Sequence, residues 1–269
     1  MDQQGRFRQA ALASGIPDDE VSRFAEHLRL SVRLSGGSGG VPVGRFGGSP
    51  PLPVGVDWPS EQGGRLPYVF SVDCAALPEV DGSKLPPHGT LLFFLDHEKD
   101  HLTEGYGRVV YGTATAQPPD GGYDLSATLV AELPDWMEPR DDDEDEDDDA
   151  ELPEGFPHLE ELRALAYDLW PLENGLASAY LGGYVDDEVI TSIAEQTLAG
   201  REQAGEIVVP VANWYSHVQR EKHRLAGEWM SLARFSADDE FYSGSFVIRH
   251  DDLAAGRVDR AFSVTGFSE

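Results

Sequence analysis

Apolar residues near the N-terminus are spaced as they are in a helix. Four apolar side chains between Pro17 and Leu30 fall at positions i, i+3, i+4 and i+7: Val21, Phe24, Ala25 and Leu28. Acidic residues follow Pro17 directly, where the positive end of a helix dipole stabilises them. The pattern therefore predicts an amphipathic helix over residues 17–30, within a helical N-terminal segment over residues 1–29.

Further along the chain, helical and strand patterns occur in separate blocks. Helical spacing returns over residues 159–169, 188–198 and 211–224. Short apolar runs bounded by turn residues predict strands at 68–72, 90–95, 108–111 and 128–131, and again near 229–235, 245–249 and 260–264. Connections of largely hairpin length indicate antiparallel pairing. The predicted fold class is α+β, with a mainly antiparallel rolled β-sheet, peripheral helices, and both groups of strands in one sheet.

Glycine and proline dominate the segment from Phe46 to Pro59, which reads Phe-Gly-Gly-Ser-Pro-Pro-Leu-Pro-Val-Gly-Val-Asp-Trp-Pro. Glycine permits a positive φ or a close backbone approach, and proline fixes an extended path. The large ring of Trp58 needs cover near the end of the segment. We therefore expect an ordered loop without regular structure, packed on the body of the protein, with Trp58 mostly buried.

This segment resembles the F-G-G-x-P-x-L-P-x-G-x-x-W-P signature of the YwqG-like family, a domain of unknown biochemical function. A second similarity lies in the C-terminal third of the chain. His223 to Gly227 resembles the family's H-x-L-L-G segment, and Arg234 to Glu240 resembles its Q-x-D-S-D-D stretch. The resemblance implies a single YwqG-like α+β domain over residues 30–267, and it assigns no reaction.

The formal net charge of the 269-residue chain is −29. The acidic run at residues 141–149 does not account for it, because the net charge stays near −20 without those nine carboxylates. This charge argues against nucleic acid and anionic membrane as partners, and it leaves a basic protein partner, a metal or simple solubility as explanations. The run itself predicts a mobile acidic loop at residues 138–152.

The sequence is typical of a cytoplasmic protein. Cys74 is the single cysteine, so no intramolecular disulfide can form, and we expect it to be a buried small apolar residue rather than a nucleophile. No apolar stretch has the length of a signal peptide or of a membrane-spanning helix.

Residues 97–101 read His-Glu-Lys-Asp-His and match the H-E-x-x-H zinc motif, in which two histidines one helical turn apart bind the metal. The motif follows an apolar run that predicts a strand, and Gly105 and Gly107 end any helix within about two turns. Zinc proteases carry the motif inside a long helix. We therefore expect an exposed polar hairpin here, with neither a metal site nor a cofactor.

Three candidate binding residues lie in or beside the signature segment. Phe46 and Trp58 could form an aromatic wall for a ligand, or they could fasten the loop to the sheet. Arg45 precedes them and could join a polar cluster with residues from the C-terminal third.

Four further candidates come from that C-terminal third. Asp238 and Glu240 alternate with Asp239, so their carboxylates could converge from one face of a strand, although a polar turn is the favoured interpretation. His223 and Arg224 could hold an anion, or they could cap the carbonyl end of the preceding helix.

The sequence favours a binding or interaction protein, with an antidote-type partner of a basic protein as one specific form. Charge supports this interpretation, and no phosphate loop, dinucleotide fingerprint or nucleophile elbow is present. The alternative is an enzyme or small-ligand binder with a cleft beside residues 45–59. Catalysis is left open, with the balance against it.

Overall fold

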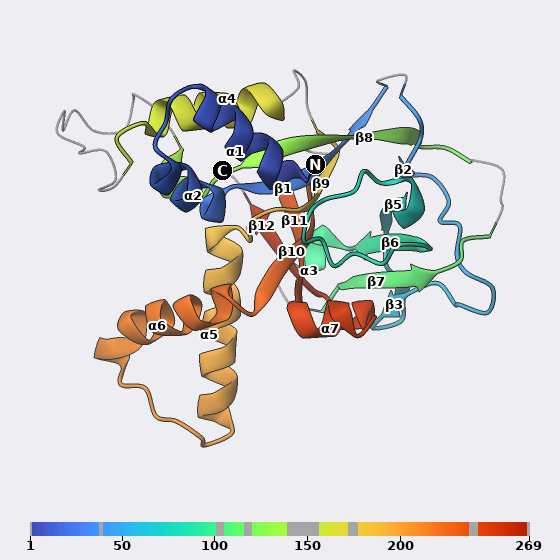
Figure 1. Ribbon diagram of the computed structural model, residues 1–269. Helices are drawn as coiled ribbons and strands as arrows, with labels where there is room; N and C mark the ends of the chain where they lie inside the picture. Colours follow the sequence, from blue (N-terminus) through green and yellow to red (C-terminus); the bar gives the residue numbers. More distant parts are fainter. Residues whose placement is uncertain are drawn as a thin grey trace.

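A computed structural model describes residues 2–37, 40–100, 105–115, 120–138, 156–171, 177–236 and 242–267, and one ten-stranded sheet forms its centre (Figure 1). The strand order is β12-β11-β10-β9-β1-β8-β2-β5-β6-β7, and every neighbouring pair is antiparallel. The strands are β1 (Arg29–Gly36), β2 (Gly44–Phe46), β5 (Tyr68–Asp73), β6 (Thr90–Leu95), β7 (Gly107–Gly112), β8 (Tyr123–Glu132), β9 (Ala179–Gly182), β10 (Trp229–Ser236), β11 (Tyr242–Arg249) and β12 (Phe262–Phe267). A separate hairpin joins β3 (Ser60–Glu61) to β4 (Gly64–Arg65).

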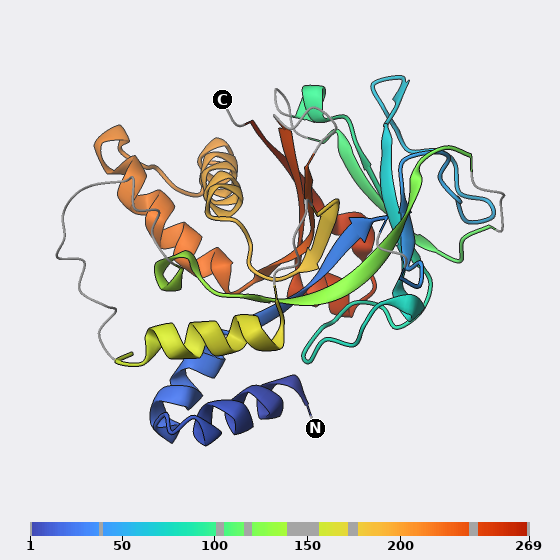
Figure 2. The same cartoon turned by 90° about the horizontal axis from the view of Figure 1, so that it is seen from above.

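Helices cover the sheet in two groups (Figures 1 and 2). The first group contains α1 (Gln3–Ala13), α2 (Asp18–His27) and α4 (Leu159–Leu169), whose apolar faces pack together and against the end of β8. The second contains α5 (Asp187–Gln203) and α6 (Trp214–Ala226), which pack on β11 and β12. Two shorter helices, α3 (His97–Asp100) and α7 (His250–Ala254), follow β6 and β11 directly.

The sheet rolls up so that side chains from its strands meet in one central core. Successive residues of a strand point to opposite faces. In β6, Leu91, Phe93 and Leu95 therefore enter the central core, whereas Leu92 and Phe94 pack outside it, under residues 52–66. Both faces of β6 are covered, which explains why it reads as an unbroken apolar run.

The two edge strands, β7 and β12, meet through a buried carboxylate rather than through strand pairing. Asp100, at the end of α3, accepts hydrogen bonds from Ser263 Oγ at 3.0 Å, Thr265 Oγ1 at 3.1 Å and the backbone N of Tyr106 at 3.0 Å. A Cβ at Gly107 would lie 2.3 Å from Ser263 Oγ, so the two edges approach closely. Burial raises the pKa of Asp100, and these hydrogen bonds partly oppose that rise.

Most of the predicted elements are confirmed. The α+β class holds, and strands from both halves of the chain share the antiparallel sheet. The four predicted helices correspond to α2, α4, α5 and α6, and the seven predicted strands to β5–β8 and β10–β12. The last strand begins only at Phe262, because residues 258–260 form a turn of 3-10 helix. The acidic loop predicted at 138–152 lies outside the described residues, except for Glu138.

Three predictions are wrong in detail. The signature segment does contain regular structure, since Arg45 and Phe46 belong to β2, which pairs with both β5 and β8. Residues 97–100 form a helical turn with Asp100 buried, instead of an exposed polar hairpin. The predicted strands also omit β1, although this strand lies between β8 and β9 in the sheet.

Two glycine pairs cross where the signature segment passes the start of β8. Gly47 and Gly48 of the signature have φ of 66° and 77°, and they pack backbone to backbone against Gly121 and Gly122. A Cβ at Gly48 would lie 2.5 Å from the carbonyl oxygen of Asp120, which no rotamer change can relieve. The diglycine of the signature is therefore required for this crossing.

Gly48→Ala is expected to destabilise the protein more than Gly55→Ala. Both positions have positive φ, of 77° and 81°, but a Cβ at Gly55 would meet nothing within 4 Å. The left-handed backbone costs each alanine about 1–2 kcal/mol, and the clash at Gly48 should add about 1–3 kcal/mol. Urea unfolding measures both values. Equal losses for the two variants would contradict the role of the crossing.

The raised pKa of Asp100 predicts a specific dependence of stability on pH. The folded protein holds this proton more tightly than the unfolded chain, so the contribution of Asp100 to stability is fully present below the ordinary pKa of 3.8. It decreases as pH rises through the raised pKa of the folded state. We therefore compare the free energies of unfolding of the wild type and Asp100→Asn by urea titration. The difference, wild type minus variant, should fall as pH rises from 3.8 through the raised pKa of Asp100. Parallel pH profiles for the two proteins would contradict the assignment.

Candidate binding site at one end of the rolled sheet

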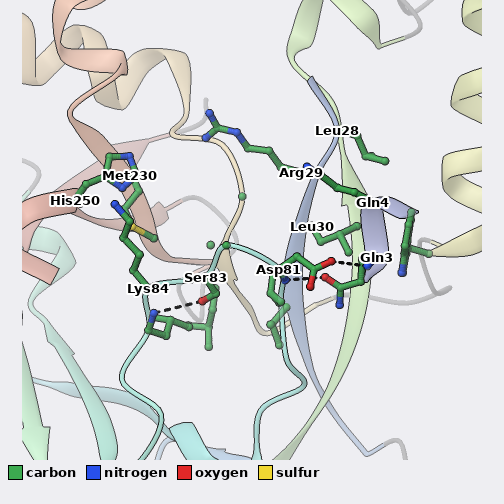
Figure 3. Close-up of a pocket in the computed structure, with 18 of the residues that line it drawn as sticks. Gln3, Gln4, Leu28, Arg29, Leu30, Asp81, Ser83, Lys84, Met230 and His250 are labelled. Carbon is green, nitrogen blue, oxygen red and sulfur yellow. Dashed lines mark hydrogen bonds between the residues drawn. The ribbon is translucent and has the colours of Figure 1, made fainter. Parts of the chain in front are cut away.

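One end of the rolled sheet contains a cavity of about 320 Å³ (Figure 3). The strand register places the beginning of β1 and β10 and the end of β9 and β11 at this end. The cavity is also lined by the start of α1, the end of α2 and residues 80–85. Segments far apart in sequence therefore build it together.

The floor of the cavity is apolar. Val32 of β1 and Leu181 of β9 belong to the central core and line the cavity, and Met230 of β10 packs against that core. Leu30 lies beside them, and the buried ring of Trp170 closes one side. The floor is thus the end of the central core, left uncovered by the strands.

The rim carries three basic side chains, from Arg29, Lys84 and His250. The guanidinium of Arg29 lies 4.2 Å from the centre of the Tyr184 ring, and the Tyr184 hydroxyl donates to the carbonyl of His27 at 2.6 Å. Neither Arg29 nor Lys84 forms an ion pair with a carboxylate among the described residues. The lining also contains the carboxylates of Glu26 and Asp81, but neither of them contacts these two cations.

His250 has the most unusual environment of the three. Its Nδ1 is buried and has no hydrogen-bond partner among the described residues. Burial lowers the pKa of His250, and the positive charges of Lys84 and Arg29 lower it further. In Figure 3 the side chain of Lys84 extends toward the His250 ring. An unpaired buried nitrogen of this kind carries a desolvation cost, and it has no accessible surface that a ligand in the cavity could contact.

The cavity is covered by the N-terminal helix and a loop that hold each other. The side chain of Gln3 accepts from Asp81 N at 2.8 Å and donates to the carbonyl of Glu79 at 2.7 Å, and its backbone N donates to the Asp81 carboxylate. The first turn of α1 is thereby fixed against residues 79–81. Apolar contact from the floor and positive donors on the rim make this cavity suited to binding.

A second cavity of about 330 Å³ lies beside the signature segment, at the opposite end of the sheet. Phe46 lines it, with its ring stacked 5.4 Å from that of Tyr123 and 6.1 Å from that of Phe70. Arg45 does not line it, because its guanidinium binds the Asp124 carboxylate at 2.6 Å and the carbonyl of Gly121. Arg45 thus fastens β2 to β8.

Trp58 acts as a loop anchor, although it is partly rather than mostly buried. Its Nε1 donates to the carbonyl of Leu66 at 2.8 Å, and its ring meets the edge of the Phe94 ring at 5.9 Å between centres. Arg65 lies over the ring at 5.3 Å. Trp58 lines neither of the two cavities, so it forms no aromatic wall there with Phe46.

The two remaining candidates that the structure describes, Arg224 and His223, line neither cavity. Arg224 lies in the last turn of α6 and pairs with the carboxylates of Glu221 and Glu228. His223 is exposed on the same turn. Asp238 and Glu240 lie outside the described residues, so their predicted roles stay predictions.

The reactive groups considered from the sequence are placed as follows. Cys74 is buried as predicted, and burial raises the pKa of its thiol to about 11, which disfavours the thiolate. His97 lines the second cavity and contacts the ring of Tyr242, whereas His101 lies outside the described residues. No cluster of three metal-ligating side chains occurs among the residues that the structure describes.

Sequence reasoning does not find the three rim residues, Arg29, Lys84 and His250. They lie in separate elements, and no sequence motif links their positions. One signal was available for part of the site. Apolar residues alternate with polar ones from Leu30 to Leu34, which is strand spacing. The strand order determines which chain segments meet at the end of that strand. The sequence pattern does not predict this order.

The fold and cavity define an α+β protein with a rolled antiparallel sheet and an apolar-floored cavity at one end. Comparison with protein families then places the chain: it belongs to the family described as domain of unknown function DUF1963, which matches residues 44–265. The match begins at β2, so α1, α2 and β1 precede it. A search of curated proteins found no match to this chain. None of the helices in the described part of the chain is long and apolar enough to span a membrane.

Proposed function

We propose that this chain is a small-molecule-binding protein whose site is the cavity lined by Arg29, Lys84 and His250. One observation carries the proposal: the apolar end of the central core is uncovered at the end of the rolled sheet and bordered by a few polar groups. Ligand sites in proteins are commonly apolar concavities with a small number of placed polar groups, and the mouths of rolled sheets are a frequent location. We also propose that the chain is YwqG-like within its family, on the signature from Phe46 to Pro59.

Filling the cavity should abolish binding of a neutral apolar dye. Met230 is partly buried on the cavity floor, so Met230→Trp places a large ring inside it. We expect titration with Nile red to show saturable binding to the wild type, lost in Met230→Trp.

Val69→Trp is the matched control, because Val69 is also partly buried and lines the second cavity. Circular dichroism confirms that both variants are folded. Loss of binding in Val69→Trp alone would overturn the proposed location and move the ligand to the cleft beside residues 45–59, the alternative expected from the sequence.

Binding of a basic protein is a second proposal, supported by a different surface. A hollow of about 740 Å³ between α4 and α5 is lined by one arginine and six carboxylate residues: Glu132, Asp135, Glu138, Asp186, Asp187 and Glu188. Glu132 pairs with that arginine, Arg234, and Asp187 pairs with Lys222, so four carboxylates of the lining have no ion pair among the described residues. Such a surface attracts basic partners through long-range steering.

An oligolysine peptide tests the second proposal. The double variant Asp135→Asn with Glu188→Gln removes two charges from the hollow and should weaken peptide binding several-fold at low salt, less so at high salt. The control variant, Asp57→Asn with Asp259→Asn, removes two exposed charges elsewhere. Equal weakening by both pairs, measured by fluorescence anisotropy, would show attraction by net charge alone and contradict a role for the hollow.

A further inference from the structure

We propose that the ligand of the cavity is an amphipathic anion, with a carboxylate or phosphate head at Arg29, Lys84 and His250 and an apolar tail on the cavity floor. This inference rests on the proposed small-molecule function and adds the chemical class of the ligand. It depends on the charges and hydrogen bonds of the rim, whereas the proposed function depends on the apolar floor.

The unpaired cations of the rim are the first support. The chain contains 49 acidic and only 20 basic residues, so a cation can readily find a carboxylate partner. At least eleven arginine and lysine side chains do so among the described residues. Arg29 and Lys84 nevertheless line the same cavity without one. An anionic head in the cavity would supply the missing partner.

The carboxylates near the rim do not take that place. Asp81 lines the cavity, but it accepts the backbone N–H of Gln3 and so holds the covering loop. Glu26 is exposed at the end of α2 and forms no ion pair with Arg29 among the described residues. The formal charges of the lining therefore balance, but neither carboxylate contacts Arg29 or Lys84, so the head of a ligand can make that contact.

His250 supplies the second support. Its ring lines the cavity beside Lys84, so an anionic head bound there would act on the imidazole through its charge, although the buried Nδ1 itself is closed to the cavity. The charged groups that act on His250 are Lys84 and Arg29, which lower its pKa, and Asp251 on its own helix, which raises it. A bound anion would favour the imidazolium. Binding should then take up a proton, so affinity should rise as pH falls from 8 to 6.

The apolar floor supplies the third support, because a small inorganic anion would leave this apolar surface uncovered. Val32, Leu181 and Met230 offer a surface that only an apolar group can cover favourably, next to the charged rim. The two parts together select a molecule with one anionic end and one apolar end.

Four eight-carbon compounds test the inference, because they share a tail and differ only in the head: octanoate, octyl phosphate, octanol and octylammonium. Calorimetric titration of the full-length protein should show at least one anion binding about tenfold or more tighter than octanol, with octylammonium the weakest. Tenfold corresponds to the loss of about one charge-assisted hydrogen bond. A preference between octanoate and octyl phosphate then identifies the head, and either one supports the inference.

Variants of the rim residues distinguish the contribution of the ligand's anionic head to binding from that of its apolar tail. Arg29→Gln and Lys84→Gln should each weaken binding of the preferred anion by about tenfold and leave octanol unchanged. Arg65→Gln is the matched control, an exposed arginine that lies over Trp58, away from the cavity. His250→Gln should remove the rise in affinity between pH 8 and pH 6.

Two failures can be distinguished. If octanol binds as well as both octanoate and octyl phosphate, and the rim variants change none of the three, the anionic ligand is wrong while the apolar site stands. If none of the four compounds binds and Met230→Trp leaves Nile red binding intact, the proposed function fails as well. Melting temperatures of the rim variants, which alter exposed or partly exposed side chains, should stay close to that of the wild type.

Discussion

The fold depends on a rolled sheet. The two edge strands of this sheet do not pair with each other, so another interaction must hold them together. A flat sheet of ten strands would expose one face, whereas rolling buries side chains from all along the sheet in one core. The edges meet where the Asp100 carboxylate receives hydroxyl groups from β12 and a backbone amide that precedes β7. A buried charge is costly, and here three hydrogen-bond donors offset part of that cost. This arrangement holds the roll together while leaving its ends uncovered, and one of those ends is the proposed ligand cavity.

Sequence reasoning succeeded where local pattern determines the element. The four helices with apolar faces and the seven predicted strands were found, because burial on one or both faces leaves a readable spacing. The strand β1 shows the same alternation from Leu30 to Leu34, yet it follows α2 with no turn residues between them, which obscured the change of period. The strand β9 has only four residues, too few for a clear pattern.

The site was less predictable than the fold, for a physical reason. Arg29, Lys84 and His250 meet only because β1 lies beside β9, and because the loop after β5 turns back over the same end. Two of the residues singled out for their chemistry make structural contacts. Arg45 fastens β2 to β8, and Arg224 neutralises two glutamates on its own helix and just beyond it. In the signature segment, the glycine pair is required because its backbone packs directly against the backbone of a second glycine pair, where a side chain would clash.

The central place of β1 also affects how the chain acquires its fold. This strand is synthesised before both of its partners, which are residues 125–132 on one side and 179–182 on the other. It has no strand partner until residues 125–132 have been made, and the two halves of the sheet cannot join until residues 179–182 are present. Contacts of such long sequence separation are entropically costly to form and tend to be made late. Until then β1 is an unpaired strand with alternating apolar residues, and it is exposed to incorrect pairing during synthesis. The two N-terminal helices precede it directly and are the nearest structure that could cover it.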